Sequence, residues 1–458
     1  MSRHSPPPVV RRCELELQSI QLSSDSEFNA HRNSRLQSLL QHHFNNDHNS
    51  AWKQLVIQHG IATAADLPRS VDELRNLPIV TKSFLREANY ASRPAVRDSE
   101  IRMTVLTSGS TGAPLSIPQS FSFSRRVWGE MFVRSLAAVG HSELCSAPGY
   151  VLGHFTNTIR NTGTYAASSS ICEMLGPTAV LGVTSSPPED HAALIRRRGI
   201  EWIAASPGFF IALAAWSAKN NNFLASSTLR ALHAGGAPID ETSRLRMMAQ
   251  LGVSAFHHVY ASTELGYIGV AVRPGGPYSL FSDEYIVEIV DEHGNHVRAG
   301  ERGRVVISVL PSDAAPLIRY ENGDTARYVG TGGPLRHFVL LDDLGRSATA
   351  FLCDAKIAYD DIAKIPQLVR ASGIPIDAFQ LVKQRNGDGR DRICLRVEST
   401  HGSREELEAS ISSALTSYHQ IEYHLRSGEL APTSIEVFSP GELTRGRFKL
   451  PLFVDETV

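Results

Sequence analysis

The stretch Thr107-Ser108-Gly109-Ser110-Thr111-Gly112-Ala113-Pro114 combines two glycines with four hydroxyl side chains, directly after the apolar pair Val105-Leu106. Glycine lets backbone N–H groups approach an anion closely, and Ser and Thr hydroxyls can donate to the remaining oxygens of that anion. The composition therefore predicts a loop that binds phosphate, with a plain flexible loop as the alternative. It is not the P-loop of strand–GxxxxGK[ST]–helix proteins, because no lysine follows the second glycine.

Length and composition indicate a large globular protein. A chain of 458 residues is too long for one ordinary core and predicts at least two domains. Its 45 basic and 47 acidic residues nearly balance, so we expect no general attraction to nucleic acid. No stretch approaches the roughly 20 apolar residues that cross a bilayer, and no secretory signal is visible. The five cysteines lie far apart without a C-x-x-C pair, which argues against a zinc site or disulfide framework and favours the cytoplasm.

Between residues 100 and 260, β-rich apolar runs alternate with helical patterns. The expected strands and helices are Ala179–Val183, Glu189–Arg198, Trp202–Ala205, Phe209–Ala218 and Leu229–His233, in alternation. Such alternation predicts an α/β fold with parallel strands and crossover helices. Residues 285–290 and 303–309 flank the turn Asp291–Asn295 and predict an antiparallel β-section.

A polar, glycine-containing break at Asp342–Arg346 separates this pattern from a compact α+β pattern, with a helix at Arg404–Tyr418 and a strand at Ser434–Phe438. We therefore place a domain boundary at the break, which leaves a second domain of ordinary size. The expected parts are a loose N-terminal segment over residues 1–27, a large α/β domain over residues 28–343, and a small, mobile α+β C-terminal domain over residues 344–458.

A second motif, Val259-Tyr260-Ala261-Ser262-Thr263-Glu264, places an aromatic ring, hydroxyls and a carboxylate in succession. An aromatic ring can stack on a purine, a hydroxyl can reach a phosphate, and a carboxylate oxygen is a preferred ligand of Mg²⁺. The alternative is a strand end in which Ser262 or Thr263 caps the following turn. Its place downstream of the glycine loop favours the functional interpretation.

A third motif, Pro316-Leu317-Ile318-Arg319-Tyr320-Glu321-Asn322-Gly323-Asp324, ends with an aspartate after a turn glycine. Such an aspartate can accept two hydrogen bonds from ribose hydroxyls, as acidic residues do in dinucleotide sites. Asn-Gly-Asp is also an ordinary turn sequence. Because the turn and the ligand role can coexist, we expect Asp324 to serve both.

In order and spacing, the three motifs resemble those of the adenylate-forming (AMP-binding) superfamily, whose members activate a carboxylate as its acyl-AMP. The resemblance covers most of residues 75–350. Leu77-Pro78-Ile79-Val80-Thr81-Lys82 is similar to the LP-x-x-TK segment of the phenylacetate–CoA ligase branch, and Leu317–Asp324 looks like that branch too. The resemblance implies an enzyme of that fold with ATP and Mg²⁺ as cofactors.

The resemblance also implies roles for individual residues. Ser108–Gly112 would hold the β- and γ-phosphates of ATP, and Tyr260 would stack on the adenine beside Gly235-Gly236-Ala237. Thr263 would contact the α-phosphate, and Glu264 would bind Mg²⁺. The complete nucleotide-binding set would be Thr107, Ser108, Gly109, Ser110, Thr111, Gly112, Gly235, Gly236, Ala237, Tyr260, Asp324 and Arg346.

Two further groups follow from the same resemblance. Asp324 would hold the ribose hydroxyls, and Arg346 would add a second ribose contact. His154 and Phe155 fall where the family places an aromatic or histidine side chain that gates the acid substrate. We interpret the neighbouring pair His257-His258 as structural.

The C-terminal part departs from the family pattern. The family's late lysine, which neutralises charge as the mixed anhydride forms, normally follows a glycine directly. Here Arg447 stands in that place and Lys449 lies two residues on, on the same face of a strand, so either could serve in catalysis. Ala348 and Asp354-Ala355 occupy hinge positions where the family carries other residues, which puts transfer to CoA in doubt.

The sequence thus predicts a ligase that adenylates an organic acid, aromatic or hydrophobic by the branch, and passes the acyl group to CoA, a carrier-protein thiol or an amine. One alternative is a related enzyme that activates nitrite or joins acids to amines in natural-product biosynthesis. Another is a nucleotide-binding protein without turnover. The sequence predicts no nucleic-acid or membrane partner and leaves the oligomeric state open.

Overall fold

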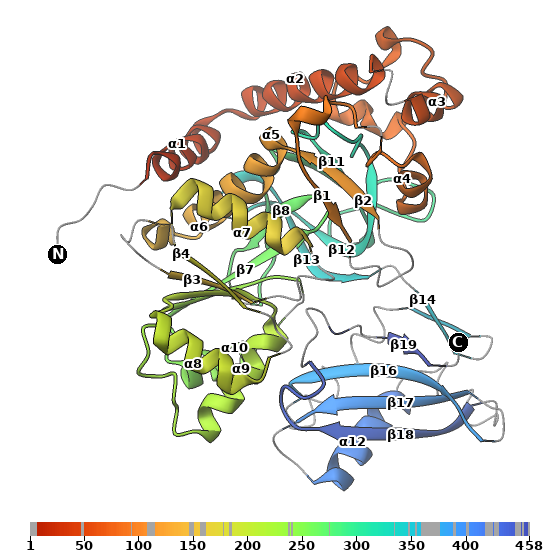
Figure 1. Ribbon diagram of the computed structural model, residues 1–458. Helices are drawn as coiled ribbons and strands as arrows, with labels where there is room; N and C mark the ends of the chain where they lie inside the picture. Colours follow the sequence, from red (N-terminus) through yellow and green to blue (C-terminus); the bar gives the residue numbers. More distant parts are fainter. Residues whose placement is uncertain are drawn as a thin grey trace.

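Figure 1 shows the computed structural model of the chain. The structure describes residues 7–46, 50–92, 94–107, 115–145, 151–155, 162–176, 178–182, 186–236, 239, 241–273, 275–333, 335–346, 349–352, 355–358, 376–387, 391–399, 403–416, 425, 430–444, 450 and 453–456.

A long mixed sheet forms the centre of the larger part. Within the described residues it has eleven strands in the order β10-β11-β12-β13-β9-β8-β7-β6-β5-β3-β4. Their bounds are β3 (Val151–Phe155), β4 (Thr178–Gly182), β5 (Trp202–Ala205), β6 (Ala231–Ala234), β7 (Ala255–Ser262), β8 (Gly266–Ala271), β9 (Tyr278–Leu280), β10 (Tyr285–Val290), β11 (Arg302–Val309), β12 (Tyr320–Gly332) and β13 (Leu335–Arg346). Strands β3 to β7 pair in parallel, and the pairs from β7 to β13 are antiparallel. The predicted α/β fold, with a parallel and an antiparallel section, is confirmed.

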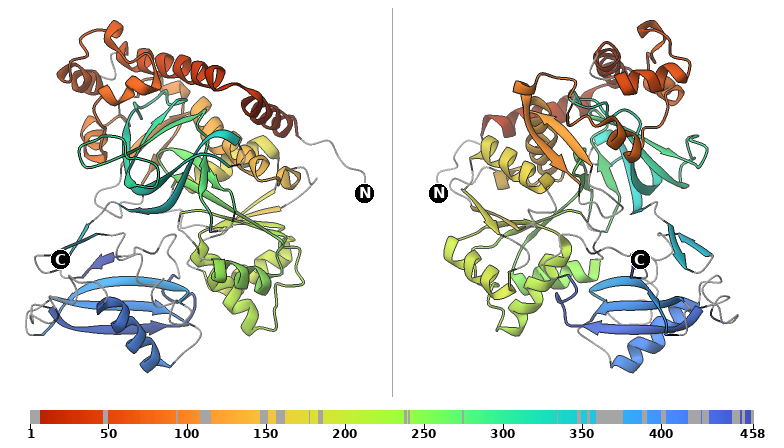
Figure 2. Two further views of the ribbon diagram at one scale, coloured as in Figure 1. Left: turned by 180° about the vertical axis from the view of Figure 1, so that it is seen from behind. Right: turned by 45° about the vertical axis from the view of Figure 1, so that its right-hand side comes forward.

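Helices cover the sheet on both faces (Figures 1 and 2). One group, α8 (Pro188–Arg198), α9 (Pro207–Lys219) and α10 (Glu241–Leu251), packs on strands β5 and β6 through an apolar cluster of its own. Proline starts α8 and α9, where its missing N–H costs nothing, and Gly199 ends α8 with a left-handed φ of 62°. The other face carries α5 (Phe121–Ser124), η5 (Arg125–Glu130), α6 (Met131–Ala138) and α7 (Thr162–Leu175).

Residues 8–22 are not the loose segment that the sequence predicts. They form helix α1 (Pro8–Leu22), whose Val10, Cys13 and Leu17 are buried in the main core against α6. These three positions lie three and four residues apart, a helical spacing that the surrounding prolines and basic residues obscure. Ser24 then caps the following helix with Glu27 in a capping box.

The remaining N-terminal elements lie over the antiparallel end of the sheet (Figure 1). They are α2 (Asp25–Phe44), α3 (Ser50–Gln58), η2 (Ala64–Asp66), η3 (Val71–Asn76), α4 (Lys82–Ala88) and η4 (Asp98–Glu100). A separate hairpin of β1 (Ile101–Leu106) and β2 (Ser116–Ser120) follows, and η6 (Ser142–Cys145) comes after α6.

The C-terminal part is a small α+β unit, as the sequence predicts. Its elements are β14 (Thr349–Leu352), β15 (Ala355–Ala358), β16 (Ala378–Arg385), β17 (Asp391–Glu398), α12 (Arg404–Thr416), β18 (Leu430–Phe438) and β19 (Phe453–Asp455). The last four strands form a sheet in the order β18-β17-β16-β19, and α12 packs on it (Figure 2). Strand β13 of the larger part continues through Arg346 and so extends past the predicted boundary at residue 343.

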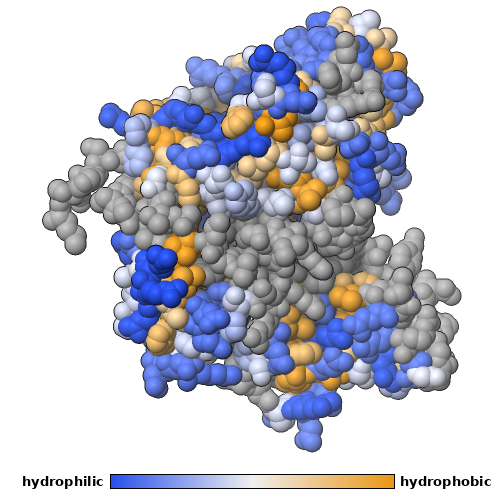
Figure 3. Space-filling model, in the orientation of Figure 1, coloured by the Kyte–Doolittle hydropathy of each residue, from blue (hydrophilic) through white to orange (hydrophobic). Residues whose placement is uncertain are grey.

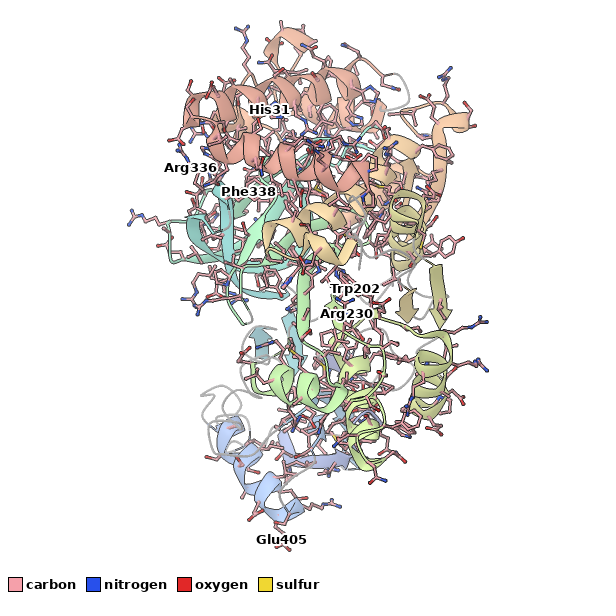
Figure 4. The ribbon with its side chains drawn as sticks, turned by 90° about the vertical axis from the view of Figure 1, so that its left-hand side faces the viewer. His31, Trp202, Arg230, Arg336, Phe338 and Glu405 are labelled. Atoms are coloured by element: carbon pink, nitrogen blue, oxygen red, sulfur yellow. The ribbon has the colours of Figure 1, made fainter. Side chains whose placement is uncertain are left out.

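The two parts give the molecule an elongated shape. In Figure 4, His31 on α2 and Glu405 on α12 lie at opposite ends of the molecule. Among the residues that Figure 3 colours by hydropathy, most are hydrophilic, and the apolar ones form separate patches. Among the described residues, no helix combines the length and apolarity that a membrane crossing needs. Cys13, Cys145, Cys172 and Cys394 are free thiols.

A buried ion cluster joins α2 and the central helices to the sheet. Arg35 donates to both carboxylate oxygens of Glu284 at 2.7 Å, and Arg126 donates to Oε1 at 2.5 Å. Arg134, whose side chain is 0% exposed, donates to Asp283 at 2.7 Å. Burial alone would raise the pKa of Glu284, but the bonds and charges of these arginines lower it to about 2.

We expect Glu284→Gln to destabilise the protein by about 3–5 kcal/mol at neutral pH, because the variant takes the anion from Arg35 and removes one of the anions that face Arg126 and Arg134. The lowered pKa contributes stability that is present above the ordinary carboxyl pKa of 4.5 and is lost as the pH falls toward 2. Urea unfolding of both proteins at several pH values measures this, and the difference should narrow on the acid side. A constant difference would show that the ionised form of Glu284 is not what stabilises the fold.

Candidate active site

The predicted phosphate loop joins the ends of β1 and β2. The N–H of Thr107 donates to the carbonyl of Leu115 at 3.0 Å, and the N–H of Leu115 donates to Oγ1 of Thr107 at 2.9 Å. These two bonds close the base of the loop, so Thr107 has a structural role there. Ser108 to Pro114, which include Gly109, Ser110, Thr111 and Gly112, lie outside the described residues.

The start of α7 brings this loop base close to Thr263. Oγ1 of Thr162 accepts a hydrogen bond from the N–H of Leu106 at 2.6 Å. A Cβ on the next residue, Gly163, would lie 3.0 Å from Cγ2 of Thr263 and 3.1 Å from its Cα. Glycine therefore permits a close approach of α7 to the second motif.

Glu264 lies in the tight turn between β7 and β8, and its side chain is only 6% exposed. Its Oε2 accepts a bond from Ser262 at 2.6 Å, and its Oε1 accepts one from the hydroxyl of Tyr320 at 3.1 Å. The ammonium of Lys82 lies 3.2 Å from Oε1. Burial would raise the pKa of Glu264, but the charge of Lys82 and the bond from Ser262 outweigh burial and lower it. The structure thus holds an ionised carboxylate at this turn.

Backbone pairing explains how Lys82, at the start of α4, reaches Glu264. The N–H of Val80 donates to the carbonyl of Arg319 at 2.8 Å, and the N–H of Glu321 donates to the carbonyl of Val80 at 2.9 Å. Thr81 then caps α4 through a bond from the N–H of Phe84 at 3.3 Å. This pairing places the Leu77–Lys82 segment along the start of β12.

Arg319 locks the same segment from the other side. It is buried, has a left-handed φ of 47°, and donates to the carbonyls of Leu77 and Arg75. Its guanidinium also pairs with Glu288 at 3.0 Å. Such backbone strain persists only where surrounding contacts hold it in place, as these bonds do.

Asp324 belongs to a hydrogen-bonded group that includes Tyr260 from the second motif. The hydroxyl of Tyr260 donates to Oδ2 of Asp324 at 2.8 Å. The amide of Asn322 donates to both the Tyr260 hydroxyl, at 2.8 Å, and Asp324, at 2.7 Å. Arg346 stands opposite Asp324 in the β12–β13 register, and only its backbone is described.

The glycines after β6 lie beside the second motif. Strand β6 is parallel to β7, and a Cβ on Gly235 would lie 3.3 Å from Cγ2 of Val259. Gly236 has a φ of 84°, a left-handed conformation that favours glycine. Ala237 lies outside the described residues.

Histidines of the region fall into two groups. His154 and Phe155 lie in β3 between β4 and β5, and only their backbone is described. His257 is fully buried, with its Nδ1 2.5 Å from Nδ1 of His233, and burial lowers its pKa to about 3. A neutral, packed imidazole agrees with a structural role for His257.

The sequence does not predict a role in the site for two of its residues. Lys82 belongs to a segment that the sequence singles out, but nothing in the segment indicates that it meets Glu264. Asn322 looks like a turn residue, although its amide joins Tyr260 to Asp324. Both contacts are long-range, so local spacing carries no signal for them. Arg447 and Lys449 lie outside the described residues.

The donor set around Glu264 suits Mg²⁺. This ion is commonly held by one or two carboxylates together with waters and substrate phosphates, and it needs no cage of protein ligands. Glu264 offers one ionised carboxylate next to the Ser262 hydroxyl. Within the described residues there is no group of three or more His, Cys, Asp or Glu side chains that would bind a metal unaided.

The chain is similar to a known enzyme family and to a curated enzyme. The family described as "AMP-binding enzyme" matches residues 45–309. The phenylacetate-coenzyme A ligase of Escherichia coli (strain K12) is 25% identical over 448 residues, which cover 95% of this chain and 96% of the relative.

Solved structures share the fold at lower identity. A 2-hydroxyisobutyryl-CoA ligase described as being in its postadenylation state with 2-HIB-AMP gives a TM-score of 0.74 at 19% identity, covering 96% of this chain and 92% of that chain. The same ligase in its thioesterification state gives 0.63, with coverages of 96% and 91%. An acyl acid amido synthetase in complex with 2,4-DB gives 0.68 at 14% identity, covering 98% and 94%.

The family match spans more than half of the chain, and the coenzyme A ligase relative aligns with nearly all of it. The chain therefore belongs to the AMP-binding enzyme family, in its phenylacetate–CoA ligase-like branch, and is a ligase.

Proposed function

We propose that this protein uses ATP to adenylate an organic carboxylic acid, releases pyrophosphate, and passes the acyl group to a thiol or amine. The acid is aromatic or hydrophobic, by analogy with the coenzyme A ligase relative. The acceptor is CoA, a carrier-protein thiol or an amine. The cysteine spacing favours the cytoplasm as the place of reaction.

One observation carries this proposal: the start of β12 joins two carboxylates suited to different parts of a nucleotide. Tyr320 on this strand contacts Glu264, and Asp324 on the same strand is bonded to Tyr260. In our proposal Glu264 binds the metal and Asp324 binds the ribose, and their bonds to the start of β12 and to Tyr260 support this assignment. Segments that are far apart in the sequence, from Lys82 to Asp324, meet at the start of β12.

The Tyr260 group prepares a platform for the nucleoside. Its hydroxyl is bonded on both sides, to Asn322 and to Asp324, so the ring is held in one orientation before ligand arrives. A fixed ring can stack on adenine at little entropic cost. In our proposal Asp324 binds the ribose hydroxyls, Arg346 adds a second contact, and Gly235 and Gly236 leave room for the base.

The Glu264 group serves the phosphates. When bound, Mg²⁺ neutralises charge on the polyphosphate as pyrophosphate leaves. Glu264 holds the ion, and Lys82 keeps that carboxylate ionised before the substrates arrive. Thr263 contacts the α-phosphate, and the loop from Thr107 to Gly112 holds the outer phosphates.

The chemistry needs no protein nucleophile. The acid carboxylate attacks the α-phosphorus in line, a phosphorus–oxygen bond forms, and the bond to pyrophosphate breaks. Catalysis is then positioning together with electrostatic stabilisation. A late cation, Lys449 or Arg447, neutralises charge between the carboxylate and the α-phosphate, and His154 and Phe155 border the acid.

Pyrophosphate exchange against a panel of acids, amines and nitrite tests the proposal. We expect exchange with one or more aromatic or hydrophobic acids. Exchange dependent on nitrite would instead support the biosynthetic alternative. ATP binding with no exchange for any member of the panel would support a nucleotide-binding protein without turnover.

We expect Glu264→Gln to abolish pyrophosphate exchange while ATP still binds, because an amide oxygen lacks the charge that Mg²⁺ prefers. Exchange kinetics and calorimetric titration with ATP measure the two effects. Circular dichroism checks that the variant is folded. Exchange close to that of the unmodified protein would remove Glu264 from the metal site.

We expect Asp324→Ala to weaken ATP affinity at least tenfold, since a charge-assisted hydrogen bond contributes about 1.5–3 kcal/mol. Tyr260→Phe is the matched control, because it keeps the ring and removes only the hydroxyl that reaches Asp324. Its effect on affinity should be smaller. If Asp324→Ala binds ATP as tightly as the unmodified protein does, Asp324 serves only in the turn and does not bind the nucleotide.

We expect Lys449→Ala to slow acyl-AMP formation about 10²–10³-fold, the scale for losing one preorganised donor to the transition state. A compact ammonium fits between a carboxylate and a phosphate better than a guanidinium does, so Arg447→Ala should have the smaller effect. Single-turnover adenylation of both variants decides between them. The reverse order would assign the role to Arg447.

A further inference from the structure

An ion pair joins the two parts of the chain at the side of α10. Arg246 on α10 contacts the carboxylate of Asp377, the residue just before β16. The Asp377 side chain is 2% exposed, whereas Arg246 is 29% exposed. Figure 1 shows α10 and the start of β16 next to each other across the two parts. The pair therefore forms at a junction that depends on how the parts are arranged.

Because Asp377 is buried, the stability of this ion pair depends on how the two parts of the chain are arranged. A carboxylate withdrawn from water is strongly destabilising once its cation is removed. If the C-terminal part turned away from α10, Asp377 would either lose its cation or have to become hydrated. In the arrangement seen here, Arg246 supplies that cation.

A chain of hydrogen bonds leads from Asp377 to the turn at residues 441–444. The N–H of Asp377 donates to the carbonyl of Glu398 at 2.9 Å. The side chain of Glu398, 0% exposed, accepts bonds at 2.9 Å from the N–H groups of Gly441 and Thr444. Thr444 precedes Arg447 and Lys449 in the sequence. The ion pair is thus bonded to the turn that leads into this segment.

The arrangement itself resembles one state of a relative more than another. The 2-hydroxyisobutyryl-CoA ligase superposes better in its postadenylation state than in its thioesterification state, with TM-scores of 0.74 and 0.63 at equal coverage of this chain. Since one enzyme provides both values, the difference comes from its conformation and not from its sequence. The Arg246–Asp377 pair occurs in the former kind of arrangement.

We propose that Arg246 is a positioning residue for the adenylation step: through Asp377 it holds the C-terminal part in the arrangement in which the acid is activated. The inference rests on the proposed adenylation. Arg246 contacts neither nucleotide nor acid. It acts through Asp377 and Glu398 on the turn at Thr444.

The test compares Arg246→Ala, Asp377→Asn and the charge-reversed double variant R246D/D377R with the unmodified protein. Arg230→Ala is the matched control, because Arg230 forms an ion pair of 3.1 Å with Glu201 inside the larger part. Figure 4 shows Arg230 near Trp202 and far from Glu405 of the C-terminal part. Two readouts are used: exchange kinetics with the best acid of the panel, and the radius of gyration in solution.

We expect Arg246→Ala and Asp377→Asn to lower kcat of exchange about tenfold with KM for ATP unchanged, and to increase the radius of gyration. The charge-reversed variant should restore most of the lost kcat and most of the original radius of gyration. Reaction of separately prepared acyl-AMP with a thiol or amine should not slow in parallel, which separates positioning from general damage.

Kinetics and radius equal to those of Arg230→Ala would overturn the proposal, as would single-variant losses that charge reversal leaves unchanged. If the unmodified protein exchanges with no acid, the proposed function fails instead. The radius of gyration still decides whether the pair holds the two parts, because it does not depend on turnover.

Discussion

The buried carboxylate of Glu264 is the constraint on which the rest of the site depends. A charge withdrawn from water needs partners, and Lys82, Ser262 and Tyr320 supply them from separate elements. Meeting that demand fixes α4, the β7–β8 turn and β12 relative to one another. The neighbouring Tyr260–Asp324 bond adds a second link between β7 and β12. The same contacts that satisfy burial therefore hold an ionised carboxylate at the β7–β8 turn and fix the orientation of the Tyr260 ring.

Ion pairs inside the larger part also hold separate elements together, further from the site. Arg134 and Arg35 tie α6 and α2 to the turn before β10, and Arg319 ties the Leu77–Lys82 segment to β12. Arginine suits these places because its planar fork can satisfy several acceptors at once. Removing one member of such a group exposes the others to uncompensated burial. The N-terminal helices are thus part of the frame that sets the position of Lys82.

The C-terminal part applies the same principle at its junction. The carboxylate of Glu398 is buried, and backbone N–H groups of the turn at residues 441–444 donate hydrogen bonds to it. Burial raises the pKa of Glu398. Asp377 extends this bonding to Arg246 of the larger part. The small sheet is in this way connected to the larger part through an ion pair, and polar contacts between domains allow relative motion more readily than a large apolar interface does.

The sequence by itself determined most of the strands and helices of the larger part and pointed to the motifs. Period and composition predicted the alternating strands and helices, because these signals are local. The interpretation of the block from Tyr260 to Glu264 as a nucleotide- and Mg²⁺-binding motif stays a prediction. Only the tertiary structure showed that Lys82 pairs with Glu264, that Asn322 bridges Tyr260 and Asp324, and that residues 8–22 form a packed helix. Those contacts join positions far apart in the chain, and their partners are chosen by burial and strand register, which no short window of sequence contains.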